Sequence, residues 1–301
     1  MRVLITGGTG FIGSGLCRTL LSAGHEVSVI SRSVSALPVQ GPRYVPWDRA
    51  AWRDAMGQAD AVVNLAGESI AAKRWTLEQK ARIRESRVET TRRLVEAMAT
   101  GPQRPSVLVS ASAIGIYGDR GDAPVDESST PGAGFLADTC QAWEAEARRA
   151  EPLGVRVVRL RIGLVLAPGG GALQKMAPPF RWFVGGPLGS GWQWVSWVHR
   201  DDVVRLIEWA LARGDCAGAL NATAPTPVTM SDFCRAVGQS LRRPSWLPAP
   251  ALALKLLLGE MADMLLTGQR VMPRAALSAG FIFRYPALAQ ALDACKIGDR
   301  Y

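Results

Sequence analysis

The sequence predicts an α/β protein with a doubly wound parallel sheet and a small, mainly helical carboxyl-terminal lobe. Short apolar runs alternate with helical patterns through the first two-thirds of the chain. The runs DAVVNLAG and SVLVSAS are almost continuously apolar, which is typical of strands covered on both faces. A glycine-rich turn follows the first run and opens the first helical segment. Strands that alternate with helices pair in parallel, and right-handed crossovers bring the loops after the strands to one edge of the sheet.

Six strands are expected in this first part, each an apolar run bounded by turn-forming or charged residues. Between them, apolar residues recur at helical spacing. The expected strands are RVLIT (2–6), EVSVIS (26–31), PRYVPW (42–47), DAVVNLAG (60–67), PSVLVSAS (105–112) and VRVVRLRIG (155–163), and the expected helices span 11–23, 49–58, 75–99 and 135–151.

After Gly163 the sequence becomes rich in glycine, proline and tryptophan. The pattern resumes at SWVHRDD, a strand expected to run into a helix capped by Asp201 or Asp202. The remainder is mainly helical and is expected to fold over the carboxyl edge of the sheet. The predicted division is a larger domain of residues 1–166 with 193–224, and a smaller lobe of residues 167–192 with 225–301.

The turn TGGTGFIG carries Gly7, Gly10 and Gly13 between a strand and a helix. Gly7 permits a tight turn, Gly10 lets the backbone approach a pyrophosphate, and Gly13 allows the helix to pack closely. The amino end of the helix adds N–H donors and partial positive charge. This context predicts a Rossmann-like dinucleotide site.

The second expected strand ends in Ser31, Arg32 and Ser33. An NAD site places a carboxylate here for the ribose 2′-hydroxyl, whereas a guanidinium can pair with a 2′-phosphate. The sequence therefore favours NADP(H). The alternative is that Arg32 stacks on the adenine or points to solvent.

Composition excludes several classes of function. The five cysteines form no metal-ligand spacing and no disulfide framework, and no secretory leader is evident, so a cytoplasmic protein without a metal is expected. The net charge of +9 comes from scattered basic residues, which does not indicate nucleic-acid binding. The longest apolar stretch, Pro248 to Leu266, is interrupted by three charges, so no membrane partner is expected. A monomer or homodimer acting on a small molecule fits these observations.

The chain resembles the extended, epimerase-like branch of the short-chain dehydrogenase/reductase superfamily. The resemblance rests on TGGTGFIG, on NLAG, VSASAIGIYG and LRIGLVLAPGG after later strands, and on WVHRDDVVRLIEWAL. More closely, it resembles an atypical subgroup, the epimerase family proteins with a carboxyl-terminal domain of unknown function. GFLADTCQAWE and GEMADMLLTGQRVMP are typical of that subgroup.

The resemblance implies which positions carry chemistry. Ser112 matches the residue that binds the reacting oxygen, with Ser110 as the alternative. The catalytic tyrosine and lysine of the superfamily correspond to Leu136 and Cys140, and its helix-borne asparagine corresponds to Arg87. The subgroup shows the cysteine and arginine replacements, and its members are expected to bind NADP(H).

Without the tyrosine, another group must supply a proton in a carbonyl reduction. Tyr117 is the nearest phenol to Ser112 along the chain, although the tyrosine of such a turn is more often positional. Cys140 is either a thiol donor or a small residue packed beside the nicotinamide. Glu68 is a candidate base or a helix-capping acid. His199 is better explained as a hydrogen-bonded structural residue than as a base.

Two hypotheses follow. The first is an NADP(H)-dependent oxidoreductase or epimerase acting on an unidentified carbonyl or hydroxyl compound, with Ser112, Tyr117, Cys140 and Glu68 as catalytic candidates. The second is a catalytically silent NADP(H)-binding sensor or scaffold. The residues expected to contact the cofactor are Gly7, Thr9, Gly10, Phe11, Ile12, Gly13, Ser31, Arg32, Leu65, Ala66, Gly67, Arg87, Ser110, Ala111, Cys140, Ile162 and Gly163.

Overall fold

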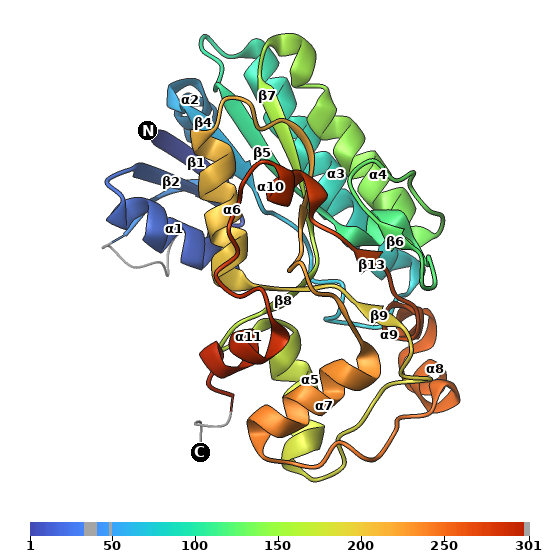
Figure 1. Cartoon of the computed structure of the whole chain (residues 1–301). Helices are drawn as coiled ribbons and strands as arrows, with labels where there is room; N and C mark the ends of the chain where they lie inside the picture. Colours follow the sequence, from blue (N-terminus) through green and yellow to red (C-terminus); the bar gives the residue numbers. More distant parts are fainter. Residues whose placement is uncertain (33–40, 48–49, 298–301) are drawn as a thin grey trace.

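The computed structural model describes residues 1–32, 41–47 and 50–297. Its centre is a sheet of seven parallel strands in the order β11-β7-β5-β4-β1-β2-β3 (Figure 1). The strand order reverses between β1 and β4, and ligands bind outside such a switch point in doubly wound sheets. The strands are β1 (Arg2–Thr6), β2 (Glu26–Ser31), β3 (Arg43–Pro46), β4 (Ala61–Asn64), β5 (Val107–Ala113), β7 (Arg156–Ile162) and β11 (Gly218–Ala222).

All six expected strands are present, and their ends differ from the expected ones by at most three residues. The sequence did not predict β11, whose residues GALNA include a single large apolar side chain, Leu220. Pairing with β7 on the edge of the sheet buries Leu220 and Ala222, so tertiary contact rather than local pattern makes this segment a strand.

Helices cover both faces of the sheet (Figure 1). On one face, Leu16 and Leu20 of α1 and Leu206 of α6 pack with Val3 and Ile5 of β1. On the other face, helices α2, α3 and α4 form a second core with the sheet. The layers therefore follow the predicted doubly wound architecture. The helices are α1 (Gly13–Ser22), α2 (Ala51–Gln58), α3 (Leu77–Thr100), α4 (Phe135–Arg148) and α6 (Arg200–Ala212), and residue 49 of the expected second helix lies outside the described residues.

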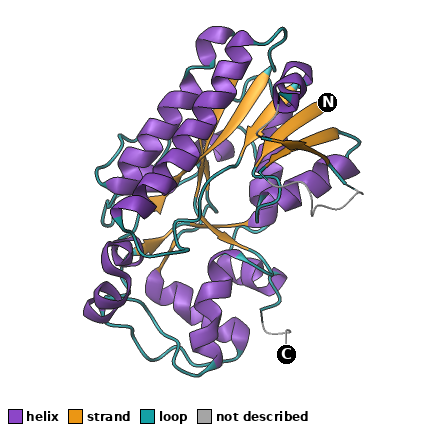
Figure 2. Cartoon of the chain, turned by 180° about the vertical axis from the view of Figure 1, so that it is seen from behind, coloured by secondary structure: helices purple, strands orange, loops and turns teal. Residues whose placement is uncertain are grey.

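A third core belongs to the carboxyl-terminal lobe, below the sheet in Figure 1 and in the reverse view of Figure 2. Phe180 of α5, Phe233 of α7 and Leu292 of α11 meet there, together with Trp197. The lobe is mainly helical, as expected. The remaining elements are the 3₁₀ turns η1 (Ile114–Tyr117), η2 (Glu151–Leu153) and η3 (Gly259–Ala262), with β6 (Pro124–Val125), β8 (Leu164–Leu166), α5 (Gly171–Arg181), β9 (Trp194–Val195), β10 (Trp197–His199), β12 (Val228–Thr229), α7 (Met230–Leu241), α8 (Ala251–Leu258), α9 (Asp263–Leu266), β13 (Arg270–Val271), α10 (Arg274–Ser278) and α11 (Leu288–Ala294).

The chain returns from the lobe to the main sheet near its carboxyl end. β13 pairs in parallel with β6, and Ala276, Phe281 and Phe283 join the core on the α1 and α6 face. The Glu127 carboxylate accepts hydrogen bonds from the backbone N–H groups of Asn221 (2.9 Å) and Ala275 (3.2 Å). Residues 270–283, which we call the returning segment, therefore pack with the main sheet and its helices, although they follow most of the lobe in sequence.

The cap of α6 differs from the expected one. His199, not Asp201 or Asp202, is the capping residue, and its Nδ1 accepts the N–H of Asp201 at 3.2 Å. Burial lowers the pKa of His199, which keeps the ring neutral and able to accept. Asp202 is fully buried, and its carboxylate accepts hydrogen bonds from the backbone N–H groups of Arg284 (2.8 Å) and Tyr285 (2.9 Å). It therefore fixes the backbone that directly follows the returning segment and does not cap α6.

Candidate functional site

The glycine turn between β1 and α1 has the geometry of a phosphate cradle. Gly7 has φ +70°, and a Cβ there would lie 2.6 Å from the carbonyl oxygen of Leu65. A Cβ at Gly13 would lie 2.2 Å from the carbonyl oxygen of Gly7. The first turn of α1 has no side-chain cap. The N–H of Ser14 donates to the carbonyl oxygen of Gly10 (2.9 Å), and the helix amino end still presents its partial positive charge to a ligand. These residues fit a dinucleotide pyrophosphate.

A cavity of about 390 Å³ lies beside this turn. Ser14 and Arg18 of α1 line it, one helical turn apart, and Tyr44 closes its β3 side. Arg32 follows β2, the neighbour of β3, and is exposed. The sequence analysis named Arg32 as a cofactor-binding residue and did not name Arg18. Arg18 follows Ser14 by four residues, so the two side chains share one face of α1, and this spacing was a usable signal. Ser33 lies outside the described residues.

The other predicted residues gather at the same carboxyl edge, because the strands they follow are parallel. Ser110 is buried inside the sheet, where Asn64 Nδ2 donates to its Oγ at 3.5 Å. Thr9, Gly10, Phe11 and Ile12 lie in the β1–α1 turn, Ser31 and Arg32 at the end of β2, Leu65 to Glu68 after β4, Ser110 to Ser112 in β5, Tyr117 in η1, and Ile162 and Gly163 at the end of β7.

Phe11 connects the glycine turn to the lobe. A Cβ at Gly170 or Gly171 would lie 2.7 Å from the Phe11 ring, so the two glycines allow the start of α5 to pack against it. The guanidinium of Arg200, at the start of α6, lies 5.3 Å from the ring centroid. The lobe therefore contacts the cofactor cradle directly.

Arg87 of α3 is a cation that lies beside the loop after β4. A Cβ at Gly67 would lie 3.1 Å from Arg87 Cζ, so the guanidinium packs against the loop after β4. In the described part of the chain its one hydrogen bond runs from Nη1 to the carbonyl oxygen of Ile83 (2.9 Å). Burial lowers the pKa of Arg87, and the charge of nearby Glu68 partly offsets this. The guanidinium is partly desolvated and retains unused donors.

Cys140 is buried on α4, within a small cluster that contains Ile116 and Val125. Burial raises the pKa of its thiol to about 11, although a backbone hydrogen bond at Ala113 and the charge of Arg87 act in the opposite direction. Cys140 is therefore a neutral thiol at physiological pH. Leu136, one turn earlier, packs against Gly115 of η1, where a Cβ would lie 3.3 Å from the Leu136 Cβ.

The burial of Cys140 predicts that its thiol reacts slowly with alkylating reagents. Iodoacetamide at about pH 8 should alkylate Cys140 at least about 100-fold more slowly than an exposed cysteine, because both the thiolate fraction and access are low. The rate should rise with pH up to a pKa of about 11. Mass spectrometry of the Cys140 peptide measures this rate, with half-buried Cys216 as the internal reference. Faster labelling of Cys140 than of Cys216 would contradict the buried position.

A buried polar network surrounds Ser112. Its Oγ donates to Glu144 Oε1 (2.8 Å), and Glu144 also accepts from Arg161 Nε (2.8 Å) and Arg159 Nη1 (3.1 Å). Ser112, Glu144 and Arg161 are each at most 6% exposed. A hydroxyl has one proton to donate, so Ser112 gives it to a carboxylate and keeps only lone pairs for a ligand. The sequence interpretation noted Glu144 in the subgroup pattern but gave it no role at Ser112.

Tyr117 belongs to the same network. Its hydroxyl donates to Asn221 Oδ1 (2.7 Å) and accepts from Arg161 Nη1 (2.9 Å), and the side chain is fully buried. Burial raises the pKa of Tyr117 above its usual value. This placement argues against Tyr117 as an acid, because its proton is committed inside the protein.

Glu68 lies after β4, and its backbone N–H donates to Ser86 Oγ (2.9 Å) on α3. It caps no helix in this position, and its side chain is partly exposed next to Arg87. The ring of His199 packs 4.2 Å from that of Tyr285, centroid to centroid, and its Nδ1 caps α6. His199 is thus placed as the structural residue that the sequence favoured.

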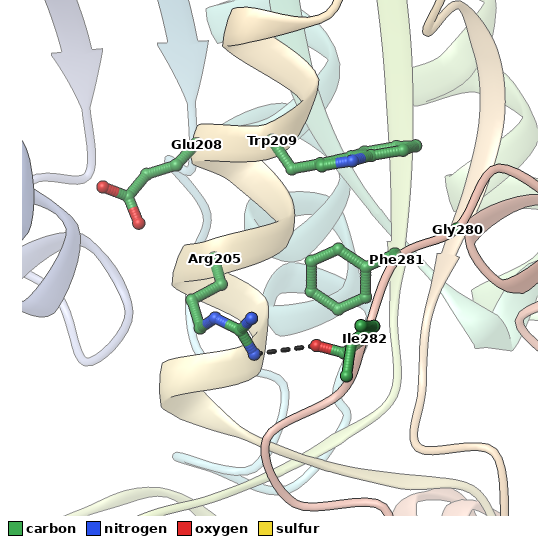
Figure 3. Close-up of a pocket in the computed structure, with 6 residues that line it drawn as sticks. All are labelled: Arg205, Glu208, Trp209, Gly280, Phe281 and Ile282. Carbon is green, nitrogen blue, oxygen red and sulfur yellow. Dashed lines mark hydrogen bonds between the residues drawn. The ribbon is translucent and has the colours of Figure 1, made fainter.

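A second surface hollow, of about 320 Å³, lies on α6 and the returning segment (Figure 3). Arg205 points into it and donates to the carbonyl oxygen of Ile282 (2.9 Å), while Trp209 and Phe281 form its apolar wall. None of its lining residues belongs to the glycine turn or to a strand end of the main sheet. It does not coincide with the predicted site.

Among the described residues, no cluster of His, Cys, Asp or Glu side chains could hold a metal ion. A search of those same residues also found no helix with the length and apolar character needed to cross a bilayer.

Comparison with known proteins agrees with this geometry. Residues 3–222 match the NAD dependent epimerase/dehydratase family, and residues 249–295 match a domain of unknown function, DUF1731. The chloroplastic epimerase family protein SDR39U1 homolog of Arabidopsis thaliana is 44% identical over 98% of this chain and 86% of its own length. Epimerase family protein YfhF of Bacillus subtilis is 37% identical over 100% of this chain and 99% of its own.

A crystal structure of human epimerase family protein SDR39U1 with NADPH superposes with a TM-score of 0.90, at 36% identity over 98% of this chain and 99% of that one. Because one relative is chloroplastic, the expected cytoplasmic location stays a prediction. The family match over most of the chain, the seven-stranded sheet and the glycine turn together place this chain in the NAD dependent epimerase/dehydratase family, among the epimerase family proteins that carry a DUF1731 domain.

Proposed function

We propose that the chain binds NADP(H) across the glycine turn, with the 2′-phosphate between Arg18 and Arg32. The cradle at Gly7 and Gly13, the uncapped start of α1 and the cavity beside it support this binding mode. The human relative crystallised with NADPH offers independent support. No carboxylate occupies position 32, where an NAD site needs one.

We infer further that the site acts on a small carbonyl or hydroxyl compound. NADPH supplies a hydride when it is bound, so carbonyl reduction leaves negative charge on the substrate oxygen. The observation that carries this inference is Arg87, a partly buried guanidinium with unused donors beside Gly67 and Cys140. A desolvated cation with free donors is suited to a developing oxyanion.

The proton must come from a group other than a phenol. Ser112 and Tyr117 donate their protons to protein acceptors, so neither is available. The neutral thiol of Cys140 is more acidic than an alcohol and lies near Arg87, which would stabilise the resulting thiolate. In this proposal the substrate oxygen takes the thiol proton, and the thiolate recovers a proton from water.

A second candidate function, an NADP(H)-binding sensor or scaffold without turnover, is favoured by the Ser112–Glu144 hydrogen bond. In the standard superfamily mechanism the serine donates to the reacting oxygen. Here its hydroxyl is turned toward a buried carboxylate that two arginines hold in place. The two candidates share cofactor binding and differ only in chemistry.

Substitution of Arg87 separates these candidates. We expect wild-type protein to oxidise NADPH with at least one member of a panel of small aldehydes and ketones. Arg87→Leu should lower kcat by at least about 100-fold, the size expected for a lost oxyanion donor, and Arg87→Lys should recover part of it. NADPH fluorescence titration of each variant shows whether cofactor binding survives. Binding without oxidation of any panel member in wild-type protein would favour the sensor.

A further inference from the structure

The outer end of the lobe, which we call the lobe tip (residues 181–192 and 242–258), exposes many large apolar side chains. Soluble proteins rarely expose contiguous apolar patches, and those that do usually use them for binding. Three of the ten tryptophans of the chain are on this surface and are at least 66% exposed. The exposed residues are Trp182, Phe183, Val184, Trp192, Trp246, Leu247, Leu252, Leu256 and Leu257.

These side chains form one surface, because the two segments of the lobe tip run together. The backbone N–H of Trp246 donates to the carbonyl oxygen of Gly185 (3.1 Å), and its indole Nε1 donates to that of Phe183 (3.1 Å). Three residues after Trp246, a second pair of backbone hydrogen bonds joins Ala249 to Pro187 and Gly189 (2.9 Å each), and α8 begins at Ala251. Figures 1 and 2 place α8 at the outer edge of the lobe, away from the main sheet.

Helix α8 is apolar almost all round. Its sequence is ALALKLLL, and none of its residues is buried. Leu252, Leu256, Ala253 and Leu257 follow one another around the helix and cover about 140° of its circumference, and Lys255 lies beside this arc, between Ala251 and Leu252. A surface helix of a globular protein normally shows a polar face to water. An exposed apolar arc bordered by a lysine is suited to the boundary between an apolar medium and water.

Charge adds a second constraint. The two segments of the lobe tip contain Arg181, Arg242, Arg243 and Lys255, and no aspartate or glutamate. The guanidinium of Arg243 lies 4.6 Å from the ring centroid of Phe183, so a basic group borders the apolar surface directly. Two acids follow α8, and both are paired: Asp263 lies 3.7 Å from Lys255, and Glu260 lies 2.9 Å from Lys80.

We propose that the lobe tip binds an anionic membrane surface. Exposed Trp, Phe and Leu side chains with basic neighbours are the combination that enters the interface between headgroups and acyl chains. Anionic headgroups would attract the exposed guanidinium groups of Arg242 and Arg243. A second copy of the chain is disfavoured, because it would bring Arg242 and Arg243 of two surfaces together, while the acids that follow α8, Glu260 and Asp263, already pair with lysines.

The proposed contact is with the surface of a bilayer, and no helix crosses the membrane in it. It departs from the sequence expectation of no membrane partner, which rested on the absence of a long uninterrupted apolar stretch. It is independent of the proposed function, because none of the lobe tip residues belongs to the cofactor cradle.

Co-sedimentation of the full chain with vesicles tests the proposal. We expect binding to phosphatidylcholine vesicles that contain phosphatidylglycerol, weaker binding to phosphatidylcholine alone, and a loss of binding as salt is raised. The double variant Leu252→Gln/Leu256→Gln should lower the partition coefficient at least about tenfold, because two leucine side chains lose their burial.

The matched control is Leu77→Gln/Ile282→Gln, which changes two leucine-sized side chains that are 85% and 77% exposed outside the lobe tip. It should leave vesicle binding unchanged, and NADPH titration should show that both double variants remain folded. The proposal is overturned if wild-type protein fails to bind anionic vesicles, or if the control loses binding equally. A dimer in light scattering that Leu252→Gln/Leu256→Gln converts to monomer would also overturn it and assign the surface to a second copy.

Discussion

Glu144→Ala is expected to lower the free energy of unfolding by about 3–5 kcal/mol, because it removes the anion from a buried ion pair and leaves the cation. Glu144 and Arg161 are 3% and 6% exposed, so water cannot replace the lost carboxylate. Ser112 loses its hydrogen-bond acceptor at the same time. Urea unfolding, followed by circular dichroism, measures the change.

The matched control is Glu78→Ala, which breaks an ion pair with Arg82 whose side chains are 74% and 56% exposed. That change should cost less than about 1 kcal/mol. Glu144→Gln keeps the shape of the side chain and one acceptor oxygen. Its loss in the free energy of unfolding should therefore lie between those of Glu144→Ala and Glu78→Ala. A loss below about 1 kcal/mol in Glu144→Ala would show that the network contributes little to stability.

The same network predicts a pH dependence. Burial opposes ionisation of Glu144, but hydrogen bonds and charge from Arg161, with Ser112 and Arg159, outweigh it and hold its pKa below the usual 4.5. A folded-state pKa below the unfolded value means that the contribution to stability is complete above the unfolded pKa and is lost as pH falls through the folded one. The stability difference between wild type and Glu144→Ala should therefore shrink as the pH is lowered below 4.5.

Arg32→Ala is expected to weaken NADPH binding by about 10- to 100-fold while changing NADH binding by less than about threefold. A guanidinium that pairs with a 2′-phosphate makes charge-assisted hydrogen bonds of about 1.5–3 kcal/mol, and NADH has no such group. Arg18→Ala should show the same selectivity, because Arg18 lines the cavity beside Gly8 and Thr9. Fluorescence titration with each cofactor gives the two dissociation constants.

Arg235→Ala is a suitable control, since its side chain is 65% exposed on α7 and pairs with Asp232. It should leave both constants unchanged. Equal losses of NADPH and NADH in Arg32→Ala would contradict the 2′-phosphate assignment and favour stacking on the adenine.

Much of the sheet was predictable because its signals are local. The apolar runs of β1, β4 and β5 are buried on both faces, and each reads as a strand without knowledge of its neighbours. The glycine turn is equally local, and Gly7 has the positive φ that the spacing implies. By contrast, β11 is a strand because it pairs with β7, and no property of GALNA alone predicts that.

The Ser112 network could not be predicted for the same reason. Ser112 and Glu144 are 32 residues apart, and the hydroxyl of Tyr117 meets Asn221 across 104 residues. The resemblance identified Ser112 as an oxygen-binding position, but the direction in which its hydroxyl points depends on the carboxylate of Glu144, which comes from helix α4. Residue types indicate which groups are present, whereas a donor's availability depends on the tertiary partner.

The returning segment has a consequence for how this protein arose. The two matched families divide the chain into residues 3–222 and 249–295, as though a second module had been appended to the first. Yet Ala276, Phe281 and Phe283 complete the core on the α1 and α6 face, and β13 pairs with β6. The boundary between the families therefore does not separate two units that could be exchanged independently by recombination. An exchange of the second module alone would also replace part of the hydrophobic core of the first, so the first module would be left with an incomplete core.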